Sequence, residues 1–181
     1  MKKILIAYFS HGGENLIENA VVDIGPIGNT AKAAMILQND LTAMGFEADL
    51  FEIEAKEPYP FSYMDTASRA RQEKMLGSKP AIKEGPEGFE GYGLVFLGYP
   101  NWWGTCPQAV LSFTSSHDFR GKILVPFVTH GGQIFLYSID DIRATLSGGD
   151  LIQGFAISAS YMSGAEAVIK DWLASNDGVL R

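Results

Sequence analysis

The sequence predicts an α/β fold of three layers, in which helices cover both faces of a doubly wound, five-stranded parallel sheet. Five segments have the apolar, β-branched and aromatic content that is typical of strands. Between them lie segments in which apolar residues recur at steps of three and four, as on one face of a helix. Strands that alternate with helices are joined by right-handed crossovers, which place helices on both faces of a parallel sheet.

The first strand and the helix that follows it organise the rest of the chain. Residues 4–9 form an apolar run typical of a buried strand, and residues 28–44 carry a helical pattern that ends at Gly45. The N-terminus of such a helix lies at the carboxyl end of the strand and presents free N–H groups there. Hydroxyl and amide side chains at this junction can surround an anion, and they belong to Ser10, Asn29 and Thr30.

Four further strands are predicted in chain order. Residues 48–53 alternate apolar and polar side chains, which indicates a half-exposed strand near a sheet edge. Residues 94–99 and 123–129 are apolar runs, and residues 151–157 give a weaker strand pattern. Pro126 supplies no ladder donor, so it predicts a bulge or a local irregularity in its strand.

Helices are predicted after each of these strands. A helix over about residues 62–76 follows the second strand, and another opens at Pro107 behind the third strand. A helix over about residues 139–146 follows the fourth, with Ser138 and Asp141 spaced as a capping box. Ser163 and Glu166 have the same spacing before the last helix.

The length and composition predict one domain that spans residues 1–181, because 46% hydrophobic and 19% charged residues are ordinary for a globular protein. Two stretches depart from the alternation of strands and helices. Residues 11–27 are inserted in the first loop, and residues 58–91 form an excursion between the second and third strands that is too short to hold its own core. This excursion could fold over a site, contact a second copy of the chain, or cover one sheet edge.

Charge and cysteine content limit the classes of partner. The net charge of −7 disfavours nucleic acids and anionic membranes, because both attract basic surfaces. No apolar run approaches the roughly 18 residues of a membrane span. Cys106 is the lone cysteine and only three histidines are present, which argues against a zinc site and is typical of a cytoplasmic protein. We interpret Cys106 as a small residue at a helix start.

Three loops that end strands are expected to converge on one crevice, because ligands of doubly wound sheets bind beyond the carboxyl ends of the strands. The loop over residues 10–30 offers hydroxyls and amides that suit a phosphate. The loop over residues 100–104 offers two tryptophans, and the loop over residues 129–137 offers a Gly-Gly turn and aromatic residues. A phosphate at one end and a flat ring at the other describe a mononucleotide.

At these residues the chain resembles the flavodoxin family, and the resemblance covers nearly its whole length. The matching segments are residues 6–10, the helix start at residues 28–30, and residues 96–105. The resemblance implies one FMN at the carboxyl edge of a five-stranded sheet with the flavodoxin-like order 2-1-3-4-5. The phosphate would lie in the first loop and the ring between the other two.

The resemblance also implies roles for residues in all three loops. Those expected to hold the phosphate at the helix start are Ser10, Gly28, Asn29 and Thr30. Those expected to border the isoalloxazine are Pro100, Asn101, Trp102, Trp103 and Gly104. Those expected to approach its other side or its edge are Thr129, His130, Gly131 and Gly132. We interpret His130 as an edge contact or a loop hydrogen bond in preference to a proton donor, and no metal ligand is assigned.

Two departures from the family pattern bear on function. Residues 11–27 interrupt the phosphate loop and must loop out and return, which their Gly-Gly and Gly-Pro pairs permit. The third loop lacks the acidic residue and the tyrosine that many electron-transfer flavodoxins place over the outer face of the ring. An uncovered face would let a quinone or a nitroaromatic stack on the flavin.

Three functions therefore remain open. The first is an FMN-binding electron-transfer flavodoxin that docks to redox partner proteins, and the acidic net charge would suit a basic patch on such a partner. The second is an NAD(P)H-dependent quinone or nitro reductase that uses FMN and reduces small quinone-like acceptors. The third is a module that binds a nucleotide or a partner without redox turnover.

Overall fold

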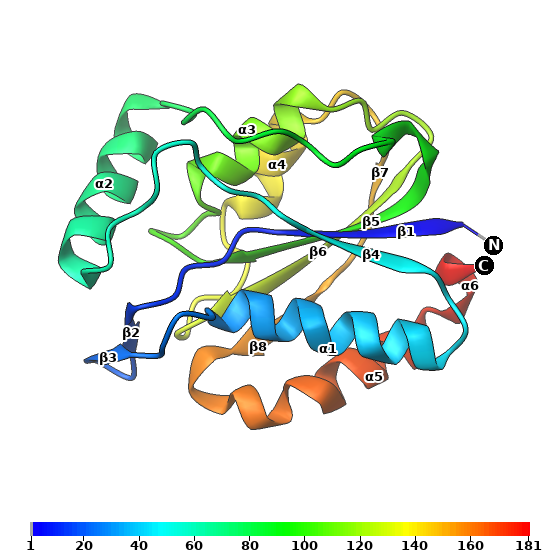
Figure 1. The fold of residues 1–181 in the computed structure, drawn as a ribbon, viewed down its shortest axis with the longest axis horizontal. Coiled ribbons are helices and arrows are strands. Elements are labelled where there is room, and N and C mark those ends of the chain that lie inside the picture. Colours follow the sequence, from blue (N-terminus) through cyan, green and yellow to red (C-terminus); the bar gives the residue numbers. More distant parts are fainter. Residues whose placement is uncertain (1) are drawn as a thin grey trace.

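The computed structural model describes residues 2–181 and contains a parallel sheet with helices on both sides (Figure 1). The sheet has the order β4-β1-β5-β6-β7, and β8 also pairs with β6. In sheet order its strands are β4 (Ala48–Glu52), β1 (Lys3–Tyr8), β5 (Tyr92–Pro100), β6 (Ile123–His130), β7 (Asp150–Leu151) and β8 (Phe155–Ser158). All of these pairings are parallel. When β7 and β8 are counted as one interrupted strand, this is the predicted order 2-1-3-4-5, so the predicted fold class is confirmed.

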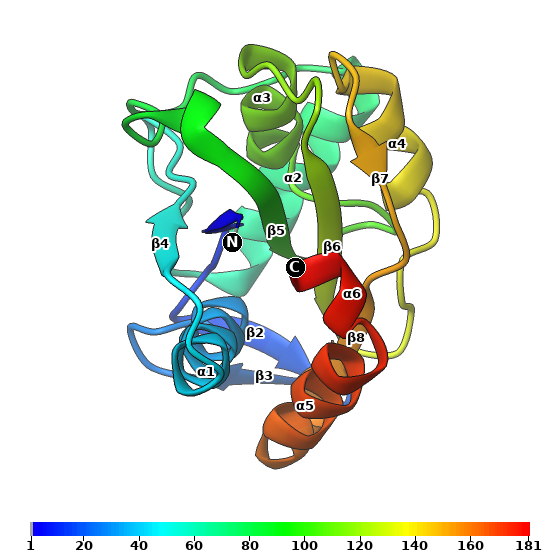
Figure 2. The ribbon, with the colours of Figure 1, turned by 90° about the vertical axis from the view of Figure 1, so that its right-hand side faces the viewer.

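Helices from different parts of the chain cover the two faces of the sheet (Figure 2). One face carries α1 (Asn29–Ala43) and α5 (Ala165–Ser175), and the short α6 (Asp177–Leu180) follows α5. The other face carries α3 (Gln108–Ser116) and α4 (Ser138–Thr145). Successive side chains of β1 point to opposite faces, so Ile4 and Ile6 belong to the core under α1, and Leu5 and Ala7 belong to the core under α3. This two-sided burial explains why the first strand is a continuous apolar run.

The last predicted strand is interrupted in the structure. Instead of one strand over residues 151–157, β7 pairs with the start of β6 and β8 pairs with its end. Pro126 lies between the two paired regions of β6 and provides no N–H for the ladder. Gly154 passes so close to it that an added Cβ would lie 1.5 Å from the Pro126 carbonyl oxygen. β6 itself runs unbroken through Pro126 and pairs with β5 in one register, so the irregularity predicted for this strand lies instead in its neighbour, between β7 and β8.

The insertion of residues 11–27 forms a β-hairpin instead of a plain loop. Its strands are β2 (Glu14–Ile17) and β3 (Ala20–Asp23), which pair antiparallel. Glu18 and Asn19 form the turn with φ of 49° and 69°, as a two-residue hairpin turn with both central residues at positive φ requires. At its base, Gly13 N–H donates to the Gly25 carbonyl oxygen at 2.7 Å, so the chain returns to the start of α1 as expected.

The excursion of residues 58–91 contains the predicted helix. This helix is α2 (Tyr63–Leu76), which begins after Ser62 and ends at Gly77 with φ of 60°. A short 3₁₀ turn, η1 (Phe89–Gly91), leads into β5. In Figure 1, α2 stands beyond the end of the sheet near the hairpin, which is the end where the strands' carboxyl termini lie. Of the three roles left open, the structure shows the first: α2 lies beside the predicted site.

Two predicted capping boxes are wrong. Ser138 is the first residue of α4, and its hydroxyl bonds the Phe135 carbonyl and the Tyr99 hydroxyl instead of a helix N–H. The segment around Ser163 is a 3₁₀ stretch, η2 (Ala159–Gly164), and Gly164 precedes α5 without a side-chain cap. No helix within residues 2–181 is long and apolar enough to cross a bilayer.

Candidate functional site

The first loop meets α1 at Gly28, where two segments of backbone lie almost in contact. A Cβ on Gly28 would lie 2.3 Å from the His11 carbonyl oxygen and 2.4 Å from Ser10 Oγ. Ser10 Oγ accepts a hydrogen bond from Ala31 N–H at 3.0 Å, so Ser10 caps the helix. Within residues 2–181, the backbone N–H groups of Asn29 and Thr30 have no acceptor, and they point out of the helix start. The helix therefore offers two free donors beside the sheet.

The first and third loops are joined by a pair of buried hydroxyls. Thr30 Oγ1 lies 2.8 Å from Thr129 Oγ1, and both side chains are buried. The bond connects the start of α1 to the end of β6. Because each hydroxyl keeps a further lone pair or proton, the pair can also bond a polar ligand above it.

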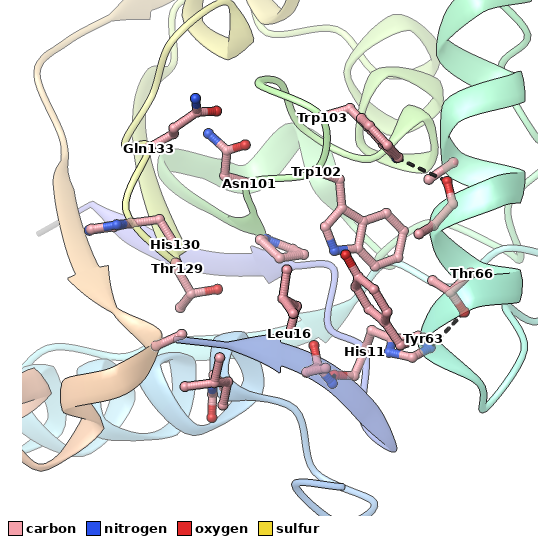
Figure 3. Close-up of a pocket in the computed structure, with 18 of the residues that line it drawn as sticks. His11, Leu16, Tyr63, Thr66, Asn101, Trp102, Trp103, Thr129, His130 and Gln133 are labelled. Carbon is pink, nitrogen blue, oxygen red and sulfur yellow. Dashed lines mark hydrogen bonds between the residues drawn. The ribbon is translucent and has the colours of Figure 1, made fainter. Parts of the chain in front are cut away.

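A pocket of about 560 Å³ opens above these hydroxyls, at the carboxyl ends of β1, β5 and β6 (Figure 3). Most of the predicted site residues line it: Asn29, Thr30, Pro100, Asn101, Trp102, Trp103, Gly104, Thr129, His130 and Gly131. The predicted residues that do not line it are Ser10, Gly28 and Gly132. Ser10 and Gly28 shape the helix start beneath the pocket, and Gly132 lies beyond His130 in the third loop.

The two tryptophans have different environments. The Trp102 ring is half-buried against Phe9 and Tyr59, with ring centroids 5.3 Å and 5.2 Å away at steep angles. Trp103 is 50% exposed and has φ of 55°, and its indole N–H donates to the Ala67 carbonyl oxygen of α2 at 2.9 Å. Trp102 thus forms an inner wall that is fixed by aromatic packing, and Trp103 forms the rim against α2.

The third loop places a neutral histidine at the pocket. His130 Nδ1 accepts the backbone N–H of Gly132 at 3.1 Å, so in the neutral ring the proton is on Nε2. Burial lowers the pKa of His130 below its ordinary value of 6.5, which keeps the ring uncharged at neutral pH. This agrees with the predicted loop hydrogen bond, and it leaves Nε2–H as a donor.

Two walls of the pocket were not predicted from the sequence. The hairpin supplies the first, and its lining residues are Glu14, Asn15, Leu16, Ile17 and Asn19. Helix α2 supplies the second, with Tyr63, Thr66, Ala67 and Ala70. His11, Gln133 and Ala159 complete the lining. Hydrophobic periodicity could not reveal these contacts, because it shows which face of an element is buried and not which loop it meets.

The hairpin and α2 hold each other in place. Glu14 Oε2 accepts the N–H of Tyr63, the first residue of α2, at 3.0 Å. His11, in the first loop, is half-buried, and its Nε2 lies 2.8 Å from the Pro60 carbonyl oxygen and 3.3 Å from Thr66 Oγ1. Glu14 is the pocket's one carboxylate, and its charge is directed at a helix N-terminus.

The polar groups of the pocket suit an anionic ligand with a flat ring. They are hydroxyls, amides and free N–H groups at one side and indole and phenol rings at the other. Among residues 2–181, no cluster of His, Cys, Asp and Glu could hold a metal ion. Cys106 is buried, and burial raises the pKa of its thiol to about 12, so it stays protonated and structural. Fold and pocket together define a mononucleotide-binding protein of the doubly wound α/β class.

Comparison with known proteins specifies this class further. The flavodoxin family model matches residues 3–176, and the chain belongs to the flavodoxin family. The resemblance found in the sequence is thereby confirmed. No curated protein matches the chain.

Several crystal structures share the fold. An inferred flavoprotein from Bacteroides eggerthii DSM 20697 is 29% identical with a TM-score of 0.69, and the match covers 97% of this chain and 98% of that one. A flavoprotein from Lactobacillus acidophilus NCFM in complex with FMN is 18% identical, with a TM-score of 0.63 over 93% of this chain and 99% of that one. A Fusobacterium nucleatum flavodoxin bound to flavin mononucleotide is 14% identical, with a TM-score of 0.56 over 98% of both chains.

Proposed function

We propose that this protein binds FMN in the pocket and acts as an electron-transfer flavodoxin. One observation carries the proposal: a single pocket joins the free N–H groups at the start of α1 to the half-buried ring of Trp102. These are the two ends that a flavin mononucleotide requires, one for phosphate and one for a flat ring. The FMN complexes of two structures with the same fold support the choice of ligand.

The residues at the helix start fit a phosphate group. Asn29 and Thr30 offer N–H donors at the positive end of the helix dipole, and no acidic side chain lies in the first turn to compete. The Thr30 and Thr129 hydroxyls lie on the same side of the pocket. Gly28 keeps the approach open, since a Cβ there would push the first loop out of place.

The residues at the other end fit an isoalloxazine ring. Trp102 is held edge-on by Phe9 and Tyr59, so it can present a fixed surface without losing side-chain freedom on binding. His130 belongs to the pocket lining and keeps a neutral Nε2–H donor there. FMN, when bound, supplies the electron-transfer chemistry, and the protein orients it and excludes water from one side.

The role as an electron carrier is the finer part of the proposal. Its support is that, among the residues that the structure describes, the pocket's carboxylate and the acceptor nitrogen of its third-loop histidine are both occupied: Glu14 accepts the Tyr63 N–H of α2, and His130 Nδ1 accepts the Gly132 N–H. The partners would be redox proteins. A cytoplasmic location belongs to the same proposal and rests on the single, buried and unpaired cysteine.

One observation favours a second candidate, an NAD(P)H-dependent quinone or nitro reductase. Helix α2 turns its small residues Ala67 and Ala70 toward the pocket, which leaves space between the helix and the second loop. A flat acceptor could enter this space and lie beside the flavin. The two candidates therefore differ in whether this space is used.

Stopped-flow oxidation of NAD(P)H with menadione present separates the candidates. The FMN-loaded carrier is expected to oxidise NAD(P)H no faster than free FMN, and Ala67→Leu is expected to leave this rate unchanged. Fast turnover that Ala67→Leu abolishes, while Ala144→Leu on the exposed side of α4 does not, would show a reductase instead. A protein that takes up no FMN would contradict both and leave the non-redox module.

A further inference from the structure

A surface that combines positively charged side chains with exposed apolar and aromatic ones lies beside the mouth of the pocket. We call it the cationic ridge, and it consists of Arg71, Lys74, Trp103, Leu136 and Tyr137. Lys74 Nζ donates to the Trp103 carbonyl oxygen at 2.5 Å and lies 5.6 Å from the Tyr137 ring centre. The Arg71 guanidinium lies 5.6 Å from the Trp103 ring centre. Leu136 and Tyr137 approach Gly104, the neighbour of Trp103, so the five side chains are contiguous.

The ridge exposes large apolar side chains in costly backbone conformations. Trp103 and Leu136 have φ of 55° and 38°, which bulky side chains rarely adopt. Both are 50% exposed, and Tyr137 is 64% exposed. The hydrogen bond from Trp103 to Ala67 and that from Asn101 Nδ2 to the Ile134 carbonyl oxygen hold the two loops in this shape. Strain that directs apolar groups into solvent does not serve the core, and such outliers cluster at binding sites.

The charge of the ridge is opposite to that of the whole chain. The net charge is −7, yet Arg71 and Lys74 form no ion pair within residues 2–181. The nearby carboxylates have other partners: Glu73 bonds Arg69 and the Tyr59 hydroxyl, Asp140 pairs with Arg143, and Asp141 accepts the Thr105 hydroxyl. Two positive charges therefore remain available to an acidic surface.

The occupant that fits this surface is a protein and not a small ligand. Arg71, Lys74, Leu136 and Tyr137 lie outside the pocket lining, and small ligands bind in concave sites. Exposed Trp, Tyr and Arg side chains beside one another are the residues that dominate protein interfaces. Trp103 belongs to both the ridge and the pocket wall, so a partner seated on the ridge would lie next to the site.

We propose that the cationic ridge docks an acidic redox protein. This inference rests on the proposed function, because docking a redox protein here serves electron transfer only if the pocket holds FMN. The acidic net charge led us to expect a partner with a basic patch. The ridge predicts an acidic partner instead, because Arg71 and Lys74 are the charges that would face it. Arg71 and Lys74 steer and orient the partner, and Trp103, Leu136 and Tyr137 supply the apolar contact.

Binding to two electron-transfer proteins of opposite charge tests the inference. The protein, with FMN added in excess, is titrated with an acidic plant-type ferredoxin and with basic cytochrome c, at ionic strengths from about 20 to about 300 mM. Ferredoxin is expected to bind more tightly at low salt and to lose affinity as salt is added. Arg71→Glu is expected to weaken this binding about fivefold. The control variant Arg120→Glu reverses the charge of an exposed arginine that pairs with Asp118 and precedes the amino end of β6, and it is expected to leave the binding unchanged.

Three results would overturn the inference. One is tighter binding of cytochrome c than of ferredoxin, because net charge would then govern docking. Another is an equal effect of Arg71→Glu and Arg120→Glu, because the ridge would then have no special part. The last is an Arg71→Glu variant that slows NADPH oxidation but binds ferredoxin normally, because the cations would then serve a small anion. Docking affinity can be measured whether or not flavin is bound, so this test and that of FMN binding can fail separately.

Discussion

Gly28 shows how one missing side chain can determine a site. Its φ of −70° and ψ of 163° are accessible to any residue, so its backbone conformation does not require glycine. The requirement is space, because a Cβ would overlap the His11 carbonyl and Ser10 Oγ. The position is therefore sensitive to a single methyl group.

Gly28→Ala is expected to lower the free energy of unfolding by about 1–3 kcal/mol, as overpacking does, and to weaken FMN binding about tenfold or more. The first loop must move for the methyl group to fit, and the capping bond from Ala31 to Ser10 is lost. Urea unfolding and an FMN titration measure the two effects. Gly91→Ala is the control, because nothing lies within 4 Å of its added Cβ. Equal behaviour of the two variants would contradict the proposed role of Gly28.

His130 gives the site a dependence on pH. Because burial lowers its pKa in the folded state, the unfolded chain binds more protons between that pKa and about 6.5. Stability from this group is therefore complete above pH 6.5 and is lost as pH falls through the window below it. His130→Asn can still accept the Gly132 N–H but does not titrate. We expect urea unfolding between pH 7 and pH 5 to show a smaller loss of stability for the variant than for wild type. An equal loss would contradict this account.

At the scale of elements, the hairpin and α2 act as one wall. Glu14 is in the hairpin but supplies the capping carboxylate for α2, and His11 joins the first loop to the residues before α2. A two-stranded hairpin is marginal by itself in water. It is ordered here because α2 and the first loop hold its base.

Glu14→Ala is expected to destabilise the wall by about 1 kcal/mol, the usual effect of losing a helix cap. Hydrogen exchange should increase at residues 13–17 and 61–66 and stay unchanged in β1 and β5. Glu87→Ala serves as the control, because Glu87 is exposed and its carboxylate has no hydrogen bond to any of residues 2–181. Exchange that increases equally throughout the sheet would mean that the wall does not open as a unit.

The elements also show what sequence patterns can predict. The strand and helix periods place every main element of the sheet, and the α2 helix is found within the excursion. The capping boxes at Ser138 and Ser163 are wrong because a hydroxyl can bond the chain elsewhere, as Ser138 does with Tyr99. The interruption between β7 and β8 depends on the contact of Gly154 with Pro126, two residues far apart in sequence.

At the scale of the molecule, the convergence of three loops could be predicted, because topology rules determine which loops share an edge. The sheet order followed from the resemblance to the flavodoxin family. The walls formed by the hairpin and α2 could not, since their positions depend on contacts such as that of Glu14 with Tyr63. The distribution of charge over the outer surface also could not be predicted from the composition. A net charge of −7 does not reveal that Arg71 and Lys74 lie together beside the pocket.

The central claim is that this pocket holds FMN, and an absorbance titration of the purified protein with FMN tests it most directly. We predict saturable binding with one FMN per chain, a change in the visible flavin bands, and quenching of tryptophan fluorescence as the ring approaches Trp102. Flavin bands that stay those of free FMN at every ratio, with unchanged tryptophan emission, would contradict the claim and leave only the fold.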